Sequence, residues 1–141
     1  MKKDRSDLVL LDINVLLALA WPNHQFHSSA TQRLERRKQR WATCALTQLG
    51  FIRLSCNPAA VTDAVSPLKA ASLLAQLVQD GFHEYLSNSP APAGVADAFG
   101  RILGHQQVTD AYLIAFARAS GARLLTFDAR LKNIEHVELL L

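Results

Sequence analysis

The stretch Leu8–Val9–Leu10–Leu11–Asp12–Ile13–Asn14 decides how this sequence folds. Four aliphatic residues run directly into a carboxylate, and an asparagine follows two positions later. A short continuous apolar run suits a strand that is buried on both faces of a parallel sheet. Asp12 would then stand at the carboxyl end of that strand, which is the edge where open α/β sheets bind ligands. The equal alternative is that Asp12 only caps the helix that follows.

The rest of the chain alternates helices with short apolar strands. We expect strands over residues 41–45, 82–86, 123–127 and 137–140, and helices over residues 15–20, 25–37, 47–56, 66–80, 95–103 and 109–120. This alternation predicts an α/β fold, with a central parallel sheet of four or five strands flanked by helices. The 141 residues are 50% hydrophobic, and neither a linker nor a repeat divides them, so we expect a single domain over residues 1–141.

The composition excludes few functions. A net charge of +3 favours an anionic partner only mildly. Cys44 and Cys56 are too few for a disulfide framework, and their spacing does not match a metal knuckle. Two reduced cysteines in a cytoplasmic protein are the simplest interpretation.

The N-terminus shares some features with a signal peptide. Lys2, Lys3 and Arg5 precede an apolar run, as in a secretory leader. Asp12 and Asn14 interrupt that run, and a charge in its middle is poorly compatible with membrane insertion. We therefore expect a folded segment here, and we expect no membrane span elsewhere.

Two further aspartates fall where they can join Asp12. The strand expected over residues 123–127 also runs into an aspartate, Asp128, so both acids would lie at one sheet edge. Asp110 stands on the apolar face at the start of the helix expected over residues 109–120. A first-turn acid favoured by the helix dipole is the alternative for Asp110.

Three carboxylates that converge need a compensating charge. At about 4 Å and an effective dielectric of about 20, each like-charge pair costs about 4 kcal/mol. A divalent cation removes that cost, and ligands that are all oxygen favour Mg²⁺ or Mn²⁺ over Zn²⁺. Such a site suits phosphodiester hydrolysis, and Asn14 and Thr126 could orient the carboxylates through neutral hydrogen bonds.

Four blocks of the sequence together resemble the PIN domain, and most closely its VapC toxin branch from bacterial toxin–antitoxin pairs. They are LDINVLLAL (residues 11–19), LTQLGFIRL (46–54), GHQQVTDAYL (104–113) and LTFD (125–128). The resemblance implies a three-layer α/β/α fold and a Mg²⁺-dependent endoribonuclease. It also implies restraint by a VapB-like antitoxin and a homodimer. The family's acids fall on Asp12, Asp110 and Asp128.

One position departs from the family pattern. PIN domains commonly carry a second acid, usually Glu, on the helix after the second strand, whereas Gln48 or Gly50 stands there in this chain. Gln48 could coordinate through its amide oxygen or hold a water, and Asp97 is a weaker candidate for a substitute. The missing charge leaves an alternative function, a catalytically weak domain that binds RNA or a partner protein. A HAD-like phosphohydrolase is disfavoured because Asn14 replaces the second aspartate that such enzymes need.

Basic residues supply candidates for RNA contacts. Arg36, Arg37 and Lys38 end the helix expected over residues 25–37, and Arg53 follows an apolar pair in the next helix. These cations could bind phosphates. For the first three, a solvated face that suits a helix C-terminus is the alternative.

Overall fold

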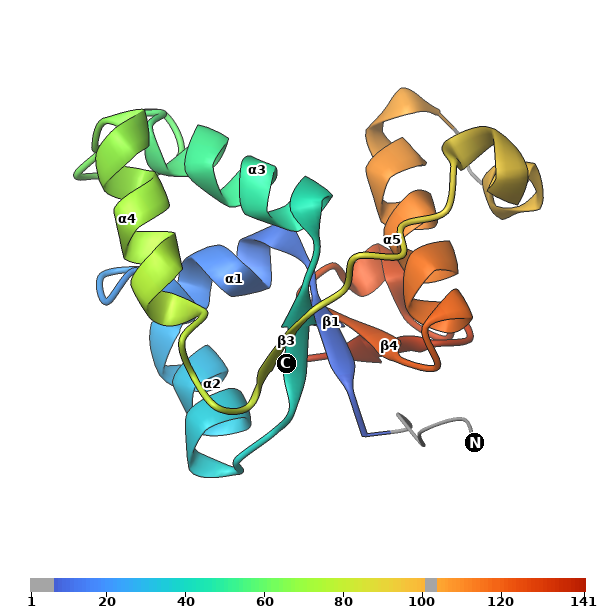
Figure 1. Cartoon of the computed structure of the whole chain (residues 1–141), viewed down its shortest axis with the longest axis horizontal. Coiled ribbons are helices and arrows are strands. Elements are labelled where there is room, and N and C mark those ends of the chain that lie inside the picture. The colour runs from blue at the N-terminus through green and yellow to red at the C-terminus, as the bar shows by residue number, and fades with distance from the viewer. Residues whose placement is uncertain (1–6, 101–103) are drawn as a thin grey trace.

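A five-stranded parallel sheet organises the computed structural model, which describes residues 7–100 and 104–141 (Figure 1). The strands are β1 (Val9–Leu11), β2 (Trp41–Thr43), β3 (His83–Tyr85), β4 (Arg123–Thr126) and β5 (Val137–Leu139). Their order is β3-β2-β1-β4-β5, and each neighbouring pair is parallel. The expected α/β fold is confirmed, and the apolar run of the opening stretch is the central strand.

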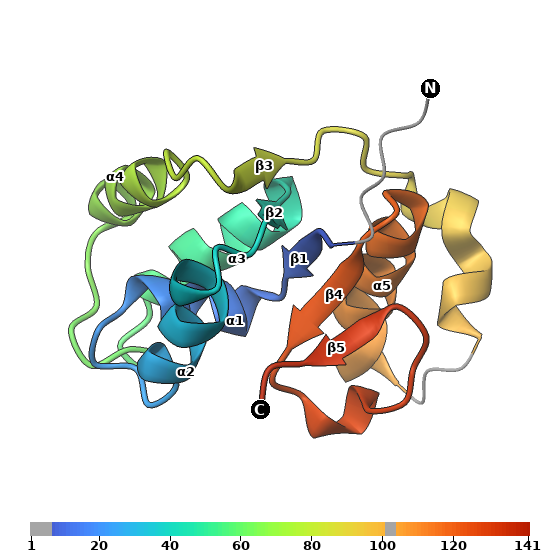
Figure 2. The ribbon, with the colours of Figure 1, turned by 90° about the horizontal axis from the view of Figure 1, so that it is seen from below.

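Helices cover both faces of this sheet. They are α1 (Ile13–Ala20), α2 (His27–Thr31), the π-helical turn η1 (Gln32–Arg36), α3 (Ala45–Ser55), α4 (Pro67–Leu77), the 3-10 helices η2 (Pro92–Phe99) and η3 (His105–Gln107), α5 (Val108–Ala119) and the 3-10 turn η4 (Ala129–Leu131). The two ribbon views place α1 to α4 on one side of the strands, and α5 with η2 on the other (Figure 2). The arrangement has three layers, as the PIN resemblance implied.

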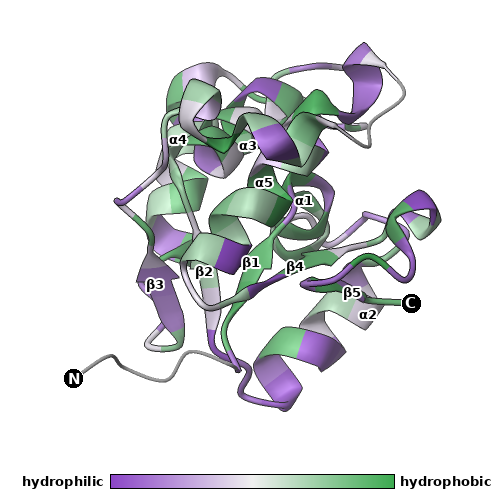
Figure 3. Cartoon of the chain, turned by 90° about the vertical axis from the view of Figure 1, so that its right-hand side faces the viewer, coloured by the Kyte–Doolittle hydropathy of each residue, from purple (hydrophilic) through white to green (hydrophobic). Residues whose placement is uncertain are grey.

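The alternation of side chains along β1 explains the layers. Val9 and Leu11 belong to the core beneath α1, whereas Leu8 and Leu10 belong to the core beneath α5. All four are fully buried. Figure 3 shows the contrast between hydrophobic β1 and the hydrophilic edge strand β3. A strand buried on both faces leaves its carboxyl end as the first place where a charge can stand.

Some predicted boundaries are wrong for identifiable reasons. Helix α3 begins at Ala45, two residues before the expected start at residue 47, and is capped by Cys44. The Thr47 hydroxyl accepts a hydrogen bond from the Cys44 amide at 3.0 Å, which is the reciprocal half of a capping box. The helix expected over residues 25–37 is shorter and changes to a π-helical turn at Gln32.

Parts of the N-terminal and loop predictions lie outside the described residues. These are Lys2, Lys3 and Arg5 of the leader-like start and the end of the helix expected over residues 95–103, of which η2 is the described part. Within the described ranges, no helix combines the length and hydrophobicity that a membrane crossing requires.

Helices α1 and α3 approach closely at Gly50. A Cβ atom built on Gly50 would lie 2.4 Å from Cδ1 and 2.8 Å from Cγ1 of Ile13. Ile13 is the first residue of α1 and directly follows Asp12. The absence of a side chain at position 50 therefore allows the helix that starts at Asp12 to pack against α3.

We expect Gly50→Ala to lower the free energy of unfolding by about 1 kcal/mol. Overpacking costs of about 1–3 kcal/mol should outweigh the roughly 1 kcal/mol of helix propensity that alanine gains. Gly81→Ala is the matched control, because no atom lies within 4 Å of a Cβ built there. Urea unfolding of both variants and of wild type measures the effect, and a Gly50→Ala variant about 1 kcal/mol more stable than wild type would show that Ile13 moves aside freely.

Candidate active site

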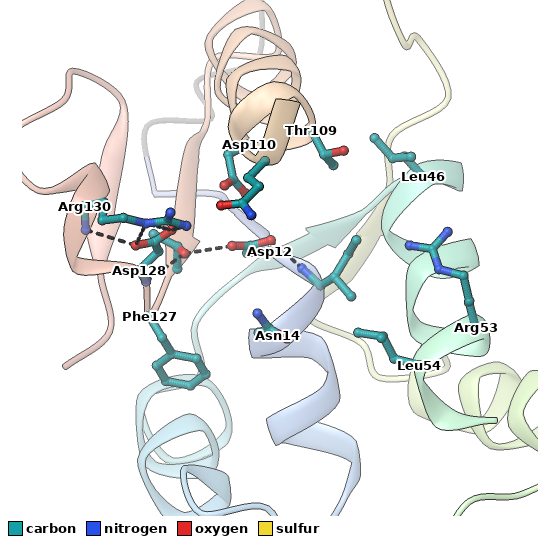
Figure 4. A pocket seen from close by; sticks show the side chains of 13 residues that line it. Asp12, Asn14, Leu46, Arg53, Leu54, Thr109, Asp110, Phe127, Asp128 and Arg130 are labelled. Atoms are coloured by element: carbon teal, nitrogen blue, oxygen red, sulfur yellow. Dashed lines mark hydrogen bonds and ion pairs between the residues drawn. The ribbon is translucent and has the colours of Figure 1, made fainter. Parts of the chain in front are cut away.

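A cavity of about 620 Å³ opens at the carboxyl edge of the central strands (Figure 4). Its lining comes from the ends of β1 and β4 and from α1, α3, η3, α5 and η4. The lining residues are Asp12, Ile13, Asn14, Leu46, Arg53, Leu54, Gln106, Thr109, Asp110, Thr126, Phe127, Asp128 and Arg130. The cavity therefore brings together all three predicted acids. It also includes Asn14 and Thr126, which were expected to orient the carboxylates, and Arg53, which was expected to contact RNA.

Asp12 is both a helix cap and a member of this acidic cluster. Its Oδ1 accepts a hydrogen bond from the Ile13 amide at 2.7 Å, and its Oδ2 accepts one from the Thr126 hydroxyl at 2.7 Å. The residue is only 7% exposed. Burial raises the pKa of Asp12, the two hydrogen bonds oppose this rise, and the charge of Asp128 adds to it.

The Thr126 hydroxyl connects the ends of the two strands. While it donates to Asp12, it accepts a hydrogen bond from the backbone amide of Asp128 at 3.1 Å. Thr126 is buried at the end of β4, next to β1 in the sheet. One hydroxyl thus fixes the Asp12 carboxylate and the backbone that carries Asp128.

Asp110 faces the other two acids from the first turn of α5. Figure 4 shows its carboxylate directed toward Asp12 and Asp128. Burial, followed by the charges of Asp12 and Asp128, raises the pKa of Asp110 to about 6, while Arg130 opposes the rise. No described residue donates a hydrogen bond to the Asp110 side chain. Like-charge repulsion is therefore only partly relieved at this carboxylate.

Asp128 is held in a different way, by an ion pair with Arg130. The Arg130 guanidinium donates from Nε to Oδ1 at 3.0 Å and from Nη2 to Oδ2 at 2.7 Å. The Arg130 backbone amide also donates to Oδ1, at 3.0 Å. These hydrogen bonds from Arg130 lower the pKa of Asp128. Asp128 is thus a firmly ionised carboxylate with a cation already bound to it.

The donor set fits a hard divalent cation by its chemistry. Asp12 and Asp110 retain acceptor capacity on their oxygens, and Asn14 adds an amide oxygen to the same cavity. The raised pKa values of both acids show that a positive charge between them would be stabilised. Across the described residues, however, no three His, Cys, Asp or Glu side chains stand in position to share a metal ion.

The two residues that could stand at the position of the family's second acid, Gln48 and Gly50, both make contacts away from the three acids. Gln48 donates from Nε2 to the Thr43 hydroxyl at 3.0 Å and does not line the cavity. The space around Gly50 is filled by Ile13. Asp97 is exposed on η2, also outside the cavity lining. The structure therefore does not bring Gln48 or Asp97 to the three acids.

The predicted basic residues are divided between two edges of the sheet. Arg53 is exposed on α3 and lines the cavity across from the acids (Figure 4). Arg36, Arg37 and Lys38 precede β2, so they lie toward the amino edge of the parallel sheet, opposite the acids. Only Arg53 of this set is placed to contact a phosphate in the cavity.

Three further polar residues line the cavity that were not expected from the sequence: Arg130, Gln106 and Thr109. Gln106 lies four residues before Asp110, a spacing that could have indicated it, whereas Thr109 directly precedes Asp110 and helical spacing does not indicate it. Arg130 lies two residues after Asp128 in the 3-10 turn η4. A basic residue in the turn that follows a strand-end acid was the available signal for this ion pair.

Comparison with known proteins agrees with this architecture. The sequence matches the PIN domain family over residues 9–137. It is 40% identical to ribonuclease VapC38 of Mycobacterium tuberculosis over 123 residues, which cover 86% of each chain. It is 39% identical to ribonuclease VapC44 of the same species over 122 residues, or 84% of each chain. The chain therefore belongs to the VapC ribonuclease family of PIN domains.

A solved structure supports the fold. The crystal structure of VapBC2 from Rickettsia felis, bound to a DNA fragment from their promoter, contains a chain that matches with a TM-score of 0.61. The match covers 94% of this chain and 96% of that chain, at 17% identity. At this identity the similarity concerns the arrangement of strands and helices only.

We expect Asp110→Asn to stabilise the metal-free protein at about pH 7 by about 1–2 kcal/mol, after discounting for solvent screening of this half-buried group. Because the folded-state pKa of Asp110, about 6, lies above its unfolded value, the stability of the wild type falls as the pH rises from about 4 to about 6 and stays lowered above that. The gain should shrink as the pH falls toward about 4, where the wild-type carboxyl is protonated in both states. Thermal unfolding with EDTA across this range tests the sign. A variant less stable than wild type at neutral pH would contradict it.

We expect Thr126→Val to lower the free energy of unfolding by about 1–3 kcal/mol, because it removes the hydrogen bond to Oδ2 of the buried Asp12 carboxylate and leaves only the Ile13 amide bonded to Oδ1. Thr126→Ser keeps the hydroxyl and is the matched control. Urea unfolding at neutral pH compares the two variants. If serine is as damaging as valine, then packing of the methyl group, and not the hydrogen bond, is what matters at this position.

Proposed function

We propose that this protein is a toxin ribonuclease whose acids Asp12, Asp110 and Asp128 use Mg²⁺, or Mn²⁺ in its place, to hydrolyse RNA phosphodiester bonds. The observation that carries the proposal is the convergence of three carboxylates from separate elements on one cavity. Their mutual repulsion helps to raise the pKa of Asp110 to about 6, which favours an added cation. The ribonuclease names of the relatives support the choice of substrate.

The side chains that line this cavity have different roles in the proposed reaction. When bound, the cation would polarise a phosphate oxygen and lower the pKa of a water molecule. Asp12 is fixed by Thr126 and by the Ile13 amide, so its position does not depend on the ligand. Asn14 adds a neutral group that can orient a carboxylate or water. Arg53 faces the acids and can bind a phosphate through two N–H groups at once.

The surrounding residues have lesser roles in this proposal. Arg36, Arg37 and Lys38 would contact phosphates only if the RNA extended around the molecule to the other sheet edge. Gln48 supports the start of α3 through its hydrogen bond to Thr43, and it would act on the cation only after leaving that partner.

We also propose the partners that the family resemblance implied. These are an antitoxin of the VapB type and a second copy of this chain, in the cytoplasm. The crystal structure of VapBC2 from Rickettsia felis supports the first. Two observations support the alternative of a catalytically weak RNA-binding module. Among the described residues no acid takes the place of the one missing at Gln48, and Asp128 is already paired with Arg130.

The test is cleavage of structured RNA with Mg²⁺ and after EDTA is added. Asp12→Asn should lower the rate about 100-fold or more, because loss of groups that only orient metal ligands already costs about 10- to 100-fold. Asp97→Asn makes the same chemical change outside the cavity and should leave the rate unchanged. RNA binding without cleavage, unaffected by Mg²⁺ or EDTA, would favour the binding module.

A further inference from the structure

We propose that Arg130 is a substrate-binding residue that exchanges Asp128 for an RNA phosphate and thereby frees Asp128 to bind the cation. This inference rests on the proposed function, since it concerns how the same cavity assembles. It assigns Arg130 a double role. In the free protein the Arg130 guanidinium is bound to the carboxylate of Asp128, and in the RNA complex it neutralises the incoming phosphate.

The first support is the saturation of Asp128. Its Oδ1 accepts hydrogen bonds from the backbone amide and Nε of Arg130, both at 3.0 Å. Its Oδ2 accepts from Nη2 at 2.7 Å and from Nε at 3.2 Å. A carboxylate offers about four lone-pair sites, so one residue engages nearly all of them. Asp128 cannot bind a cation directly while these side-chain hydrogen bonds remain.

The second support is the contrast with the other two acids. Asp110 accepts no hydrogen bond from a described residue, and Asp12 accepts one on each oxygen. Two acids therefore have open acceptor sites, while the third is closed. This difference is consistent with the finding that no three acids among the described residues are arranged around a common metal position.

The third support is the low cost of the exchange. The Arg130 side chain is 57% exposed, and exposed ion pairs are weak. Arg130 lines the same cavity as the acids, so a phosphate bound there comes within reach of its guanidinium. A guanidinium binds phosphate through two parallel hydrogen bonds as readily as it binds a carboxylate. An arriving phosphate can thus replace Asp128 as the partner of Arg130.

The exchange has a thermodynamic consequence that can be measured. If RNA frees a metal ligand, then RNA must raise the affinity for the cation, and the cation must raise the affinity for RNA by the same factor. Mn²⁺ binding can be followed by calorimetry, without any catalytic turnover. A phosphorothioate RNA oligonucleotide, which resists hydrolysis, can serve as the substrate analogue.

We expect wild-type protein to bind Mn²⁺ about tenfold more tightly when saturated with the oligonucleotide. Arg130→Met should bind Mn²⁺ several-fold more tightly than wild type without oligonucleotide, because Asp128 is open from the start. The oligonucleotide should no longer improve this affinity, and it should itself bind about tenfold more weakly. Arg130→Lys, which keeps the charge but not the paired geometry, should retain only part of the coupling.

Arg53→Met is the matched control, because it removes the same charge from the same cavity without touching Asp128. It should weaken oligonucleotide binding and leave the coupling to Mn²⁺ intact. Equal effects of Arg53→Met and Arg130→Met on Mn²⁺ affinity would overturn the exchange, since charge alone would then explain them. Wild-type Mn²⁺ binding that is indifferent to the oligonucleotide would overturn it too. Absence of Mn²⁺ binding in all variants would overturn the metal-dependent function as well.

Discussion

The hydrogen bond from the Thr126 hydroxyl to the Asp12 carboxylate is the interaction on which the acidic edge depends. It joins the ends of the two central strands and leaves Asp12 with one donor on each oxygen. Because β1 is buried on both faces, Asp12 stands where the hydrophobic core ends and the cavity begins. Burial raises the pKa of this carboxylate, and those two donors oppose the rise. The position of the acid is therefore a property of the sheet and does not require a ligand.

The same sheet holds the acids in an arrangement that opposes folding. Asp110 is placed by the first turn of α5, and the buried face of that helix, which includes Leu113 and Phe116, is packed against β1 and β4. The apolar contacts of α5 fix Asp110 close to two other negative charges, and its pKa is raised first by burial and then by this repulsion. Rigid elements with large buried surfaces can tolerate such repulsion, and a binding site needs it in order to favour a cation.

Regular patterns in the sequence predicted the fold and the convergence of the three acids on one sheet edge. Two particular side-chain contacts were not predicted. The strands before Asp12 and Asp128 are buried on both faces, and a strand of this kind is visible in the sequence as a continuous apolar run. The closure of Asp128 by Arg130 depends on one turn conformation. The exclusion of a side chain at Gly50 depends on where Ile13 lies in space. Neither contact leaves a periodic trace. The one available signal for the ion pair was the basic residue two positions after Asp128.

The charges that remain in the cavity suggest why cation and RNA should bind together. Three carboxylates and two guanidinium groups, those of Arg53 and Arg130, line it. A fourth acid would hold a cation more firmly, but it would also repel the phosphates of RNA more strongly. With Gln48 engaged elsewhere, the cavity attracts a cation less strongly and admits an anionic substrate more easily. In the proposed exchange, the phosphate takes the place of Asp128 on Arg130, so the third acid would become available to the cation only when RNA is present.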